Sequence, residues 1–275
     1  MPRTTPPPAP IPNVTTIDEV VEALDSIIRW SIEASSRLGY FAALYKRVTI
    51  AVKVALEQGG FEDGPRMERF DVAFAGRYFA AMNGFFHPRQ YRKPTHSWQV
   101  TFDAAQRTEP IIVQHMLGGI NAHIGLDLGI VAQTIAAGVQ LPTLQEDFNR
   151  LNAVLASQIS GVVEDINELS PVLADLYAAL QEQQIALINE AVRSFRDSAW
   201  RFATLLAASP DVVDPGVILA RDLHVAQQGA LIYSPPVPIA VFVSAIAARE
   251  SRDVIGNLRV LDHIASKPAP ISMVL

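Results

Sequence analysis

The chain has 275 residues, enough for one large domain with a substantial core or for two small ones. Hydrophobic residues make up 49% of it and charged residues only 18%, which predicts much buried apolar surface or an apolar patch that meets a ligand, lipid or partner. The net charge of −6, without a basic cluster, argues against a nucleic-acid-binding protein. The absence of cysteine excludes disulfides, thiolate nucleophiles and zinc fingers.

The first fifteen residues are predicted to form a disordered, proline-rich tail, because six of the first twelve are proline. The tail has no apolar segment and no basic start beyond Arg3, so it does not resemble a secretory signal. The longest apolar run elsewhere, Val237 to Ala248, is shorter than the roughly 20 residues of a membrane span and is expected to be a buried helix. We therefore expect a soluble, cytoplasmic protein with no transmembrane segment.

The first half of the chain predicts four helices. Thr16 and Glu19 have the spacing of a capping box that opens a helix over residues 17–36, which Gly39 is expected to end. A second helix over 41–58 is closed by a glycine pair, and Pro65 suits the first turn of a third over 65–83. A long loop over 84–95 precedes a short helix over 97–106.

The second half predicts helices over residues 111–137, 143–167, 171–208, 217–231 and 239–263. Thr143 with Glu146 forms another candidate capping box at the start of the second of these. No strand-like alternation persists beyond four residues. Residues 16–275 are therefore predicted to form a single all-α domain, a bundle of seven to nine helices.

The segment Gln114–Gly129, QHMLGGINAHIGLDLG, carries the main candidate site. On a regular helix, at about 100° per residue, His115, His123 and Asp127 lie on one face and are interleaved with large apolar residues. Buried imidazole and carboxylate groups must find partners or shift their pKa values. We therefore expect the catalytic residues, if the protein is an enzyme, to be these three.

The other side of this helix is a strip of small residues. The strip would let a second helix approach closely, and Gln114 and Asn121 at its border could bond to the neighbouring backbone. Asn121 is also a candidate substrate-binding residue. The members of the strip are Gly118, Ala122, Gly125 and Gly129.

His123 and Asp127 are four residues apart, so their side chains can meet. They could hold one divalent metal ion, or the carboxylate could orient the imidazole as a general base. His115 lies about 12 Å further along the helix axis, too far to share an ion with His123 unless the helix breaks at Gly118. Otherwise His115 marks the far end of an elongated pocket. A structural role for the histidines and the ion pair also fits the pattern.

A second polar concentration lies in the helix predicted over 171–208. Arg193, Asp197 and Arg201 recur every four residues with Trp200 beside them. They form either a surface ladder of ion pairs or a substrate-binding wall for an anionic group. His87 and His96, which flank the loop over 84–95, could contribute to a lid, although an ordinary surface loop fits as well.

The motif H-x-L-x-G-I-N-A-H-x-x-x-D-L, from His115 to Leu128, resembles the signature of a family of bacterial and fungal helical proteins known only as a domain of unknown function. The similarity extends over about residues 45–203. It implies one helical domain with a site at the motif, and it assigns no chemistry. It rests on further short segments: Gly60-Phe61-x-Asp63 with Met67, Phe74-Ala75-x-x-Tyr78, Trp98 with Phe102, Asp147-Phe148-Asn149-x-x-Asn152 and Ala199-Trp200-x-x-Ala203.

Three functions fit these observations. The first is an enzyme that acts on a small, largely apolar molecule, with one divalent metal ion or by His–Asp acid–base chemistry. The second is a non-catalytic binding protein or carrier for a hydrophobic ligand. The third is a structural or interaction module in which the motif only packs helices. The sequence specifies neither the substrate nor the oligomeric state.

Overall fold

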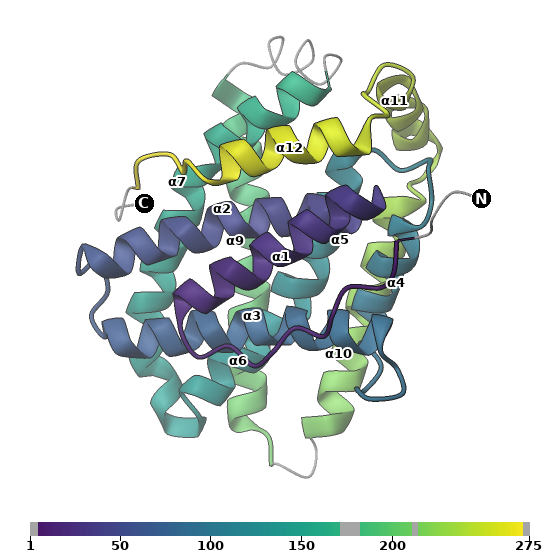
Figure 1. The fold of residues 1–275 in the computed structure, drawn as a ribbon. Helices are drawn as coiled ribbons and strands as arrows, with labels where there is room; N and C mark the ends of the chain where they lie inside the picture. The colour runs from purple at the N-terminus through teal and green to yellow at the C-terminus, as the bar shows by residue number, and fades with distance from the viewer. Residues whose placement is uncertain (1–4, 171–181, 211–213, 272–275) are drawn as a thin grey trace.

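In the computed structural model, which describes residues 5–170, 182–210 and 214–271, every regular element is a helix and no strand occurs in these ranges (Figure 1). The all-α prediction is confirmed. The helices are α1 (Ile17–Ala34), α2 (Leu38–Glu57), α3 (Gly64–Phe86), α4 (His96–Ala105), α5 (Ile112–Ala122), α6 (Leu128–Ile135), α7 (Gln145–Leu169), α9 (Glu182–Ala208), α10 (Asp214–Tyr233), α11 (Val237–Ala247) and α12 (Val254–Ala265).

A π-helical turn, His123–Asp127, joins α5 to α6, and a 3-10 helix, Gly138–Leu144, precedes α7. With Ile112–Ile135 counted as one continuous helix, the described residues contain ten helices, so the prediction of seven to nine was wrong. The helix predicted over 239–263 is in fact two. Glu250 turns inward to accept the backbone N–H of Ile112 at 2.9 Å, and Asp253 caps a new helix by accepting from Gly256.

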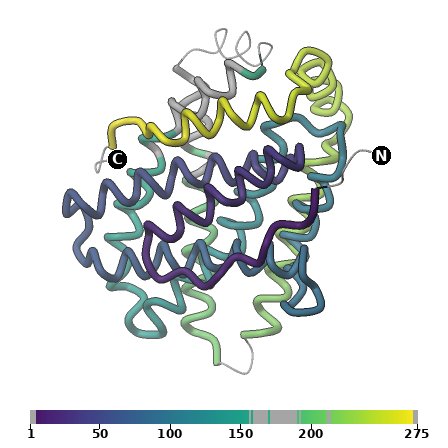
Figure 2. Tube along the Cα trace, in the orientation of Figure 1, coloured from purple at the N-terminus to yellow at the C-terminus, as the bar shows by residue number. Residues whose placement is uncertain are grey.

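The continuous helix α5–α6 lies at the centre of the domain. It contacts α2, α4 and α10 through α5, and α3 and α9 through α6. In Figures 1 and 2, α1, α2 and α12 lie toward the viewer, while α9 and α10 lie behind the central helix. The candidate motif therefore sits where side chains from at least five other helices can reach it.

The turn between α1 and α2 differs from the prediction. Ser35 adopts a left-handed conformation, with φ of 50°, and ends α1. Gly39, expected to break the helix, lies inside α2, where a Cβ atom would stand only 2.7 Å from Ser31 Cβ and 2.8 Å from Leu258 Cδ2. The glycine is needed there for close packing of α12, not for a turn.

The proline-rich segment is extended over its described part, residues 5–15, and side chains of the domain bind it, although most of its residues are exposed. Trp30 donates its indole N–H to Pro6 O at 2.8 Å, and His87 Nε2 donates to Pro8 O at 2.8 Å. Asn83 bonds both the N–H and the carbonyl of Ile11, each at 2.8 Å. The disorder predicted for residues 1–15 stays a prediction, and these contacts arise because proline-rich sequence retains carbonyl acceptors that side chains can bind.

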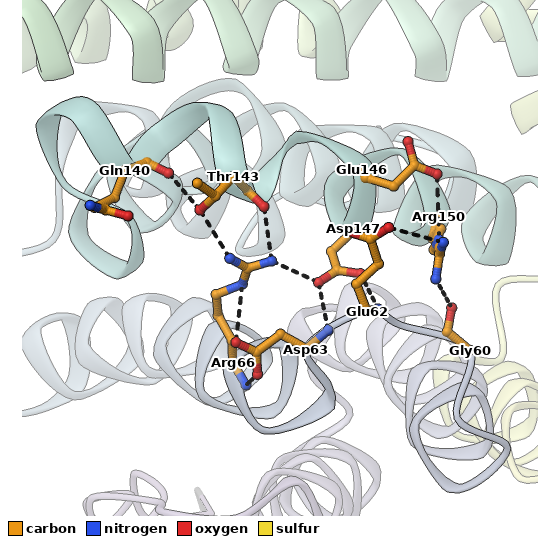
Figure 3. A network of polar contacts seen from close by, with 9 residues as sticks. All are labelled: Gly60, Glu62, Asp63, Arg66, Gln140, Thr143, Glu146, Asp147 and Arg150. Carbon is orange, nitrogen blue, oxygen red and sulfur yellow. Dashed lines mark hydrogen bonds and ion pairs between the residues drawn. The ribbon is translucent and has the colours of Figure 1, made fainter.

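A polar network ties the loop before α3 to the start of α7 (Figure 3). The buried Asp147 carboxylate accepts the backbone N–H groups of Glu62 at 2.6 Å and Asp63 at 3.1 Å, and Arg66 Nη2 at 2.9 Å. Thr143 does not cap α7 as predicted. Its hydroxyl donates to Gln140 O and accepts from Arg66. Two of the segments named in the family resemblance, the one at Gly60–Asp63 and the one that begins at Asp147, are thus joined by this network.

Helix α11 was expected to be buried and is not. Val237 is 76% exposed and Val241 68%, and Ile246 is the one residue of α11 that is buried. Apolar residues surround the whole helix, but only one side of it faces the domain. Within the described part of the chain no single helix has the length and apolar character to cross a membrane. Two pairs of helices reach that length and apolar character only when their members are taken together, and each pair is bent: Ile112–Ile135 with Gly138–Leu155, and Asp214–Tyr233 with Val237–Ala247.

Candidate functional site

The central helix does not break at Gly118 and Gly119, which are both helical. Aromatic side chains occupy the space that a Cβ atom would need at these positions: the hydroxyl of Tyr233 at Gly118 and the ring of Phe41 at Gly119. Because the helix is continuous, His115 and His123 stay two turns apart. The structure does not bring them together as ligands of one ion.

The small-residue strip packs as predicted. Gly125 faces Val225 on α10, where a Cβ atom on the glycine would stand 3.1 Å from Val225 Cγ1. Gly129 faces Phe202 on α9, where a Cβ atom would stand 2.7 Å from Phe202 Cδ1. The side-chain amide of Asn121 donates to Val225 O at 2.9 Å, and that of Gln114 donates to Ile232 O at 2.6 Å. The expected bonds to the neighbouring backbone are confirmed. For Asn121 this is a packing role, and its substrate-binding role stays a prediction.

The stretch from His123 to Asp127 forms a π-helical turn, which the sequence did not predict. Such turns insert one residue into an α-helix and recur at functional sites. The carbonyl of Gly125, inside this turn, accepts Arg221 Nε of α10 at 2.7 Å. His123 Nδ1 still lies 3.3 Å from Asp127 Oδ2, so the predicted meeting of the two side chains is observed.

Asp127 is completely buried and receives hydrogen bonds from two further elements. Arg77 Nε of α3 donates to Oδ1 at 2.9 Å, and the indole N–H of Trp98, on α4, donates to Oδ2 at 2.8 Å. Burial alone would raise the pKa of Asp127. The His123 hydrogen bond, the Arg77 charge and the Trp98 bond outweigh burial and hold the pKa below its usual value. Asp127 is therefore a carboxylate.

His123 is 2% exposed and lies among aromatic rings. Phe74 stacks on it with ring centroids 3.6 Å apart and planes 3° apart, and Tyr45 meets it edge-on at 4.8 Å. Burial lowers the pKa of His123, and the bond to Asp127 opposes this only in part. A neutral imidazole beside a carboxylate carries its proton on Nδ1. Its Nε2 lone pair has no hydrogen-bond partner among the described residues.

Two further buried groups escaped the sequence analysis: Tyr45, beside His123, and Asp71, whose charge acts on Tyr45. Tyr45 Oη and Asp71 Oδ2 have no hydrogen-bond partner in the described part of the chain. Burial raises the pKa of Asp71 to about 7, helped by Glu68, and burial, Asp71 and Asp127 raise that of Tyr45. Tyr45 marks one end of the family resemblance, which could have drawn attention to it. For Asp71 and Arg77 the sequence holds no comparable signal.

His115 forms a separate polar locus. It is 3% exposed, and its ring lies between Tyr40 and Tyr233, with centroid distances of 5.8 and 6.0 Å. Burial lowers the pKa of His115 to about 3, and the charge of Arg37 acts in the same direction. Phe41 borders the cavity beside His115 and also lies 5.9 Å from the ring of His123, so aromatic side chains separate the two loci.

The predicted wall on α9 lies away from this interior. Arg193, Asp197 and Arg201 are exposed, and none of the salt bridges in the described part of the chain joins two of these three side chains. Trp200 is half-buried against Phe148, at 4.9 Å between ring centroids. The buried cation of this helix is instead Arg196, 2% exposed, and burial lowers its pKa to about 9. The structure therefore does not join these four predicted substrate-binding residues to the His123–Asp127 pair.

The loop before α4 is also anchored. Asp222 of α10 accepts the backbone N–H groups of His96 at 2.7 Å and Ser97 at 2.9 Å, and contacts His96 Nδ1 at 2.9 Å. These bonds fix the start of the helix that carries Trp98. They indicate that this end of the loop is anchored, which does not favour a movable lid.

The side chains at the site can be compared with the ligands that a metal ion needs. Within the described residues, no three His, Asp or Glu side chains are grouped so that they could hold a metal ion. Both oxygens of Asp127 already accept hydrogen bonds, one from the Arg77 cation. An ion between His123 and Asp127 would have to displace these donors and the Nδ1 proton. The geometry is better suited to a carboxylate that orients an imidazole.

Comparison with known families supports the resemblance noted in the sequence. The family described as "Family of unknown function (DUF5995)" matches residues 17–235, well over half of the chain, and the match includes every member of the His123–Asp127 site. Comparisons with curated proteins and with solved structures gave no match. The chain belongs to the DUF5995 family of unknown function.

Proposed function

We propose that this protein is an enzyme that uses His123 as a general base on a small, largely apolar molecule. One observation carries the proposal: a neutral imidazole is oriented by a buried carboxylate at 3.3 Å and keeps its Nε2 lone pair free of any partner among the described residues. An acceptor buried without a partner is costly, typically about 1–3 kcal/mol. A substrate proton or an activated water would give Nε2 the partner it lacks.

The surroundings of Asp127 support this role. A carboxylate that accepts from Arg77 and Trp98 stays ionised and fixed in place. It can then hold the His123 tautomer and stabilise the imidazolium that forms when Nε2 takes a proton. Three helices supply these groups, so the pair is held by the tertiary structure and not only by its own helix.

The proposed substrate class follows from the rings around His123. Phe74, Tyr45 and Phe41 offer apolar surfaces, and the charged groups of the site are already paired with each other. A charged substrate would lose its hydration without gaining a counterion. Tyr45 Oη and Asp71 Oδ2, both buried without partners, are the groups in this region that could return a proton.

Access to Nε2 would come through α3. Phe74 and Arg77 are both partly exposed, while the residues they touch, His123 and Asp127, are buried. Movement of the Phe74 ring off His123 would make room beside the imidazole, so that a substrate could reach Nε2 in the ring plane, and would leave the Arg77–Asp127 ion pair intact. We propose that substrate binding displaces Phe74.

The test is a turnover assay with a panel of small apolar esters, epoxides and ketones. The proposal expects turnover of at least one class, lowered about 100-fold or more in His123→Gln. His224→Gln, an exposed histidine on α10, is the matched control and should keep full activity. No turnover by the wild type, with His123→Gln altering only the melting temperature, would contradict the proposal and support a structural module.

The structural alternative has its own supporting observation. His123, Asp127 and Phe74 do not line the cavity beside His115, and His123 and Asp127 are only 2% and 0% exposed, so solvent does not reach the pair in this conformation. If the pair only specifies packing, His123→Gln and Asp127→Asn should lower stability by similar amounts. They should do so without any change in ligand binding.

A further inference from the structure

A second pair of buried polar groups lies on the other side of the aromatic rings. His115 of α5 is 3% exposed and Tyr233 of α10 is 6% exposed. His115 Nε2 and Tyr233 Oη have no hydrogen-bond partner of good geometry among the described residues, although the Thr101 side chain lies close enough to the Tyr233 hydroxyl to lower its pKa. Both residues line a cavity of about 10 Å³, close to the space that a single water molecule requires.

The two side chains reach the same place on the central helix. The Tyr233 hydroxyl lies directly against Gly118, because a Cβ atom at that position would collide with it. Gly118 is three residues after His115, one turn along the same helix. The ring centroids of His115 and Tyr233 are 6.0 Å apart. Their polar atoms can therefore bind one small group together.

The chemistry of the pair is that of one acceptor and one donor. The backbone of Pro110 acts on His115 as an acceptor and raises the pKa of the ring against the effect of burial, and proline offers only a carbonyl, so a proton is favoured on the ring nitrogen on that side. The other nitrogen, Nε2, then presents a lone pair to the cavity. Tyr233 keeps its phenolic hydrogen, because burial raises its pKa far above neutral.

This pattern selects the occupant by charge. A cation would be repelled by Arg37 and Arg107, whose charges both act on His115, and an anion, although these charges attract it, would have no hydrogen to donate to the Nε2 lone pair. A purely apolar group would leave both polar atoms unsatisfied. A hydroxyl group can donate to Nε2 and accept from Tyr233 at the same time.

We propose that His115 and Tyr233 form a binding site for a single neutral hydroxyl group, supplied by a water molecule or by a small alcohol. Phe41, Tyr78 and Trp98 line the apolar side of the cavity, and they would have to move apart to admit the body of an alcohol, because the cavity as it stands has room for about one water molecule. The site does not depend on catalysis by His123. It would remain if the proposed function failed.

The first test compares the thermal unfolding of Tyr233→Phe with that of Tyr91→Phe, a matched change at an exposed tyrosine. If a hydroxyl group occupies the site, removing the Tyr233 donor lowers the melting temperature by about 2–4 °C and the control leaves it unchanged. If the site is empty, the same change removes an unsatisfied buried hydroxyl. An unchanged or higher melting temperature would then overturn the proposal.

A second measurement keeps the proposal falsifiable if Tyr233→Phe is destabilising only through packing. A high-resolution crystal structure of the full chain should show an oxygen within hydrogen-bond distance of both His115 Nε2 and Tyr233 Oη. Absence of such density would overturn the proposal whatever the melting temperatures show.

Titration of ¹⁵N-histidine-labelled protein with phenol, and with toluene as its isostere lacking the hydroxyl, identifies the source. If the site takes an alcohol, phenol shifts the His115 Nε2 signal and toluene does not. The affinity for phenol should then be at least tenfold lower in Tyr233→Phe and unchanged in His123→Gln. The crystallographic oxygen without a phenol response assigns it to water, and an equal response to toluene contradicts hydroxyl selection.

Discussion

The indole N–H of Trp98 lies 2.8 Å from Asp127 Oδ2, and the same indole ring lines the cavity beside His115. Trp98 therefore connects the His123–Asp127 pair to the His115–Tyr233 cluster. Its ring is also stacked between Tyr78, at 5.0 Å, and Phe102, at 5.3 Å, so its position is fixed by packing as well as by the hydrogen bond.

Replacing Trp98 with Phe should therefore weaken both clusters. The change removes one of the donors to a fully buried carboxylate, and the expected loss of stability is about 2–4 kcal/mol from the lost bond and the smaller ring. Urea unfolding monitored by circular dichroism measures it. Trp30→Phe, whose indole donates to Pro6 on the surface, is the control and should cost less. Equal losses would contradict the buried role of Trp98.

Asp127→Asn tests the orientation of His123. The amide keeps the shape of the carboxylate but loses its charge, so Arg77 loses its counterion and the His123 tautomer is no longer fixed. We expect activity to fall about 100-fold or more and stability by about 3–5 kcal/mol, the usual cost of breaking a buried ion pair. Asp103→Asn, at an exposed site on α4, should change neither quantity.

Asp71 gives the protein a specific pH dependence. Its folded-state pKa is raised to about 7 from an ordinary value of 3.8. The unfolded chain therefore ionises first, and the stability that Asp71 contributes is fully present below about pH 4 and is lost as the pH rises to about 7. Asp71→Asn should remove this loss, which is at most about 4 kcal/mol at about 1.4 kcal/mol per pKa unit.

Denaturant unfolding of the wild type and Asp71→Asn at pH 5 and pH 8 measures this effect. The variant should gain stability relative to the wild type between the two values. Asp103→Asn provides the background pH dependence of an exposed carboxylate on α4. A constant difference between Asp71→Asn and the wild type would show that Asp71 ionises normally in the folded protein.

The glycines of the central helix provide a packing test. Gly119→Ala places a Cβ atom into the ring of Phe41, and it should destabilise the protein by about 1–3 kcal/mol or more. Gly76→Ala on α3 is the matched control, because no atom lies within 4 Å of the place that the new Cβ atom would take. That change should be neutral or stabilise the helix by up to about 1 kcal/mol. Thermal unfolding of both variants distinguishes steric packing from helix propensity.

Local patterns in the sequence predicted much of the fold and part of the site. Capping residues and apolar spacing placed most helices, and the small-residue strip with Gln114 and Asn121 bonded as expected. The His123–Asp127 pair was predictable because both residues lie on one helix, four positions apart. Each of these features depends on residues close together in the chain.

The partners of that pair were not predictable in the same way. Arg77 and Trp98 contact Asp127 from α3 and α4, and Tyr45 contacts His123 from α2. These residues are far apart in the chain, and a periodic pattern within one helix cannot predict such contacts. The exposure of α11 likewise depends on how the other helices pack, because they cover only one side of it. The segment 171–181, predicted as part of a long helix, lies outside the described residues, and Glu182–Ala208 is helical as expected.

The protonation state of His123 tests the central claim most directly. In ¹H–¹⁵N spectra of histidine-labelled protein at pH 7, we predict a neutral ring protonated on Nδ1, with an unprotonated Nε2 that stays unprotonated as the pH is lowered through the usual pKa of histidine. Asp127→Asn should change this tautomer, and His224→Gln should not. A proton on Nε2 at neutral pH, or an imidazolium, would contradict the assignment of His123 as a base oriented by Asp127.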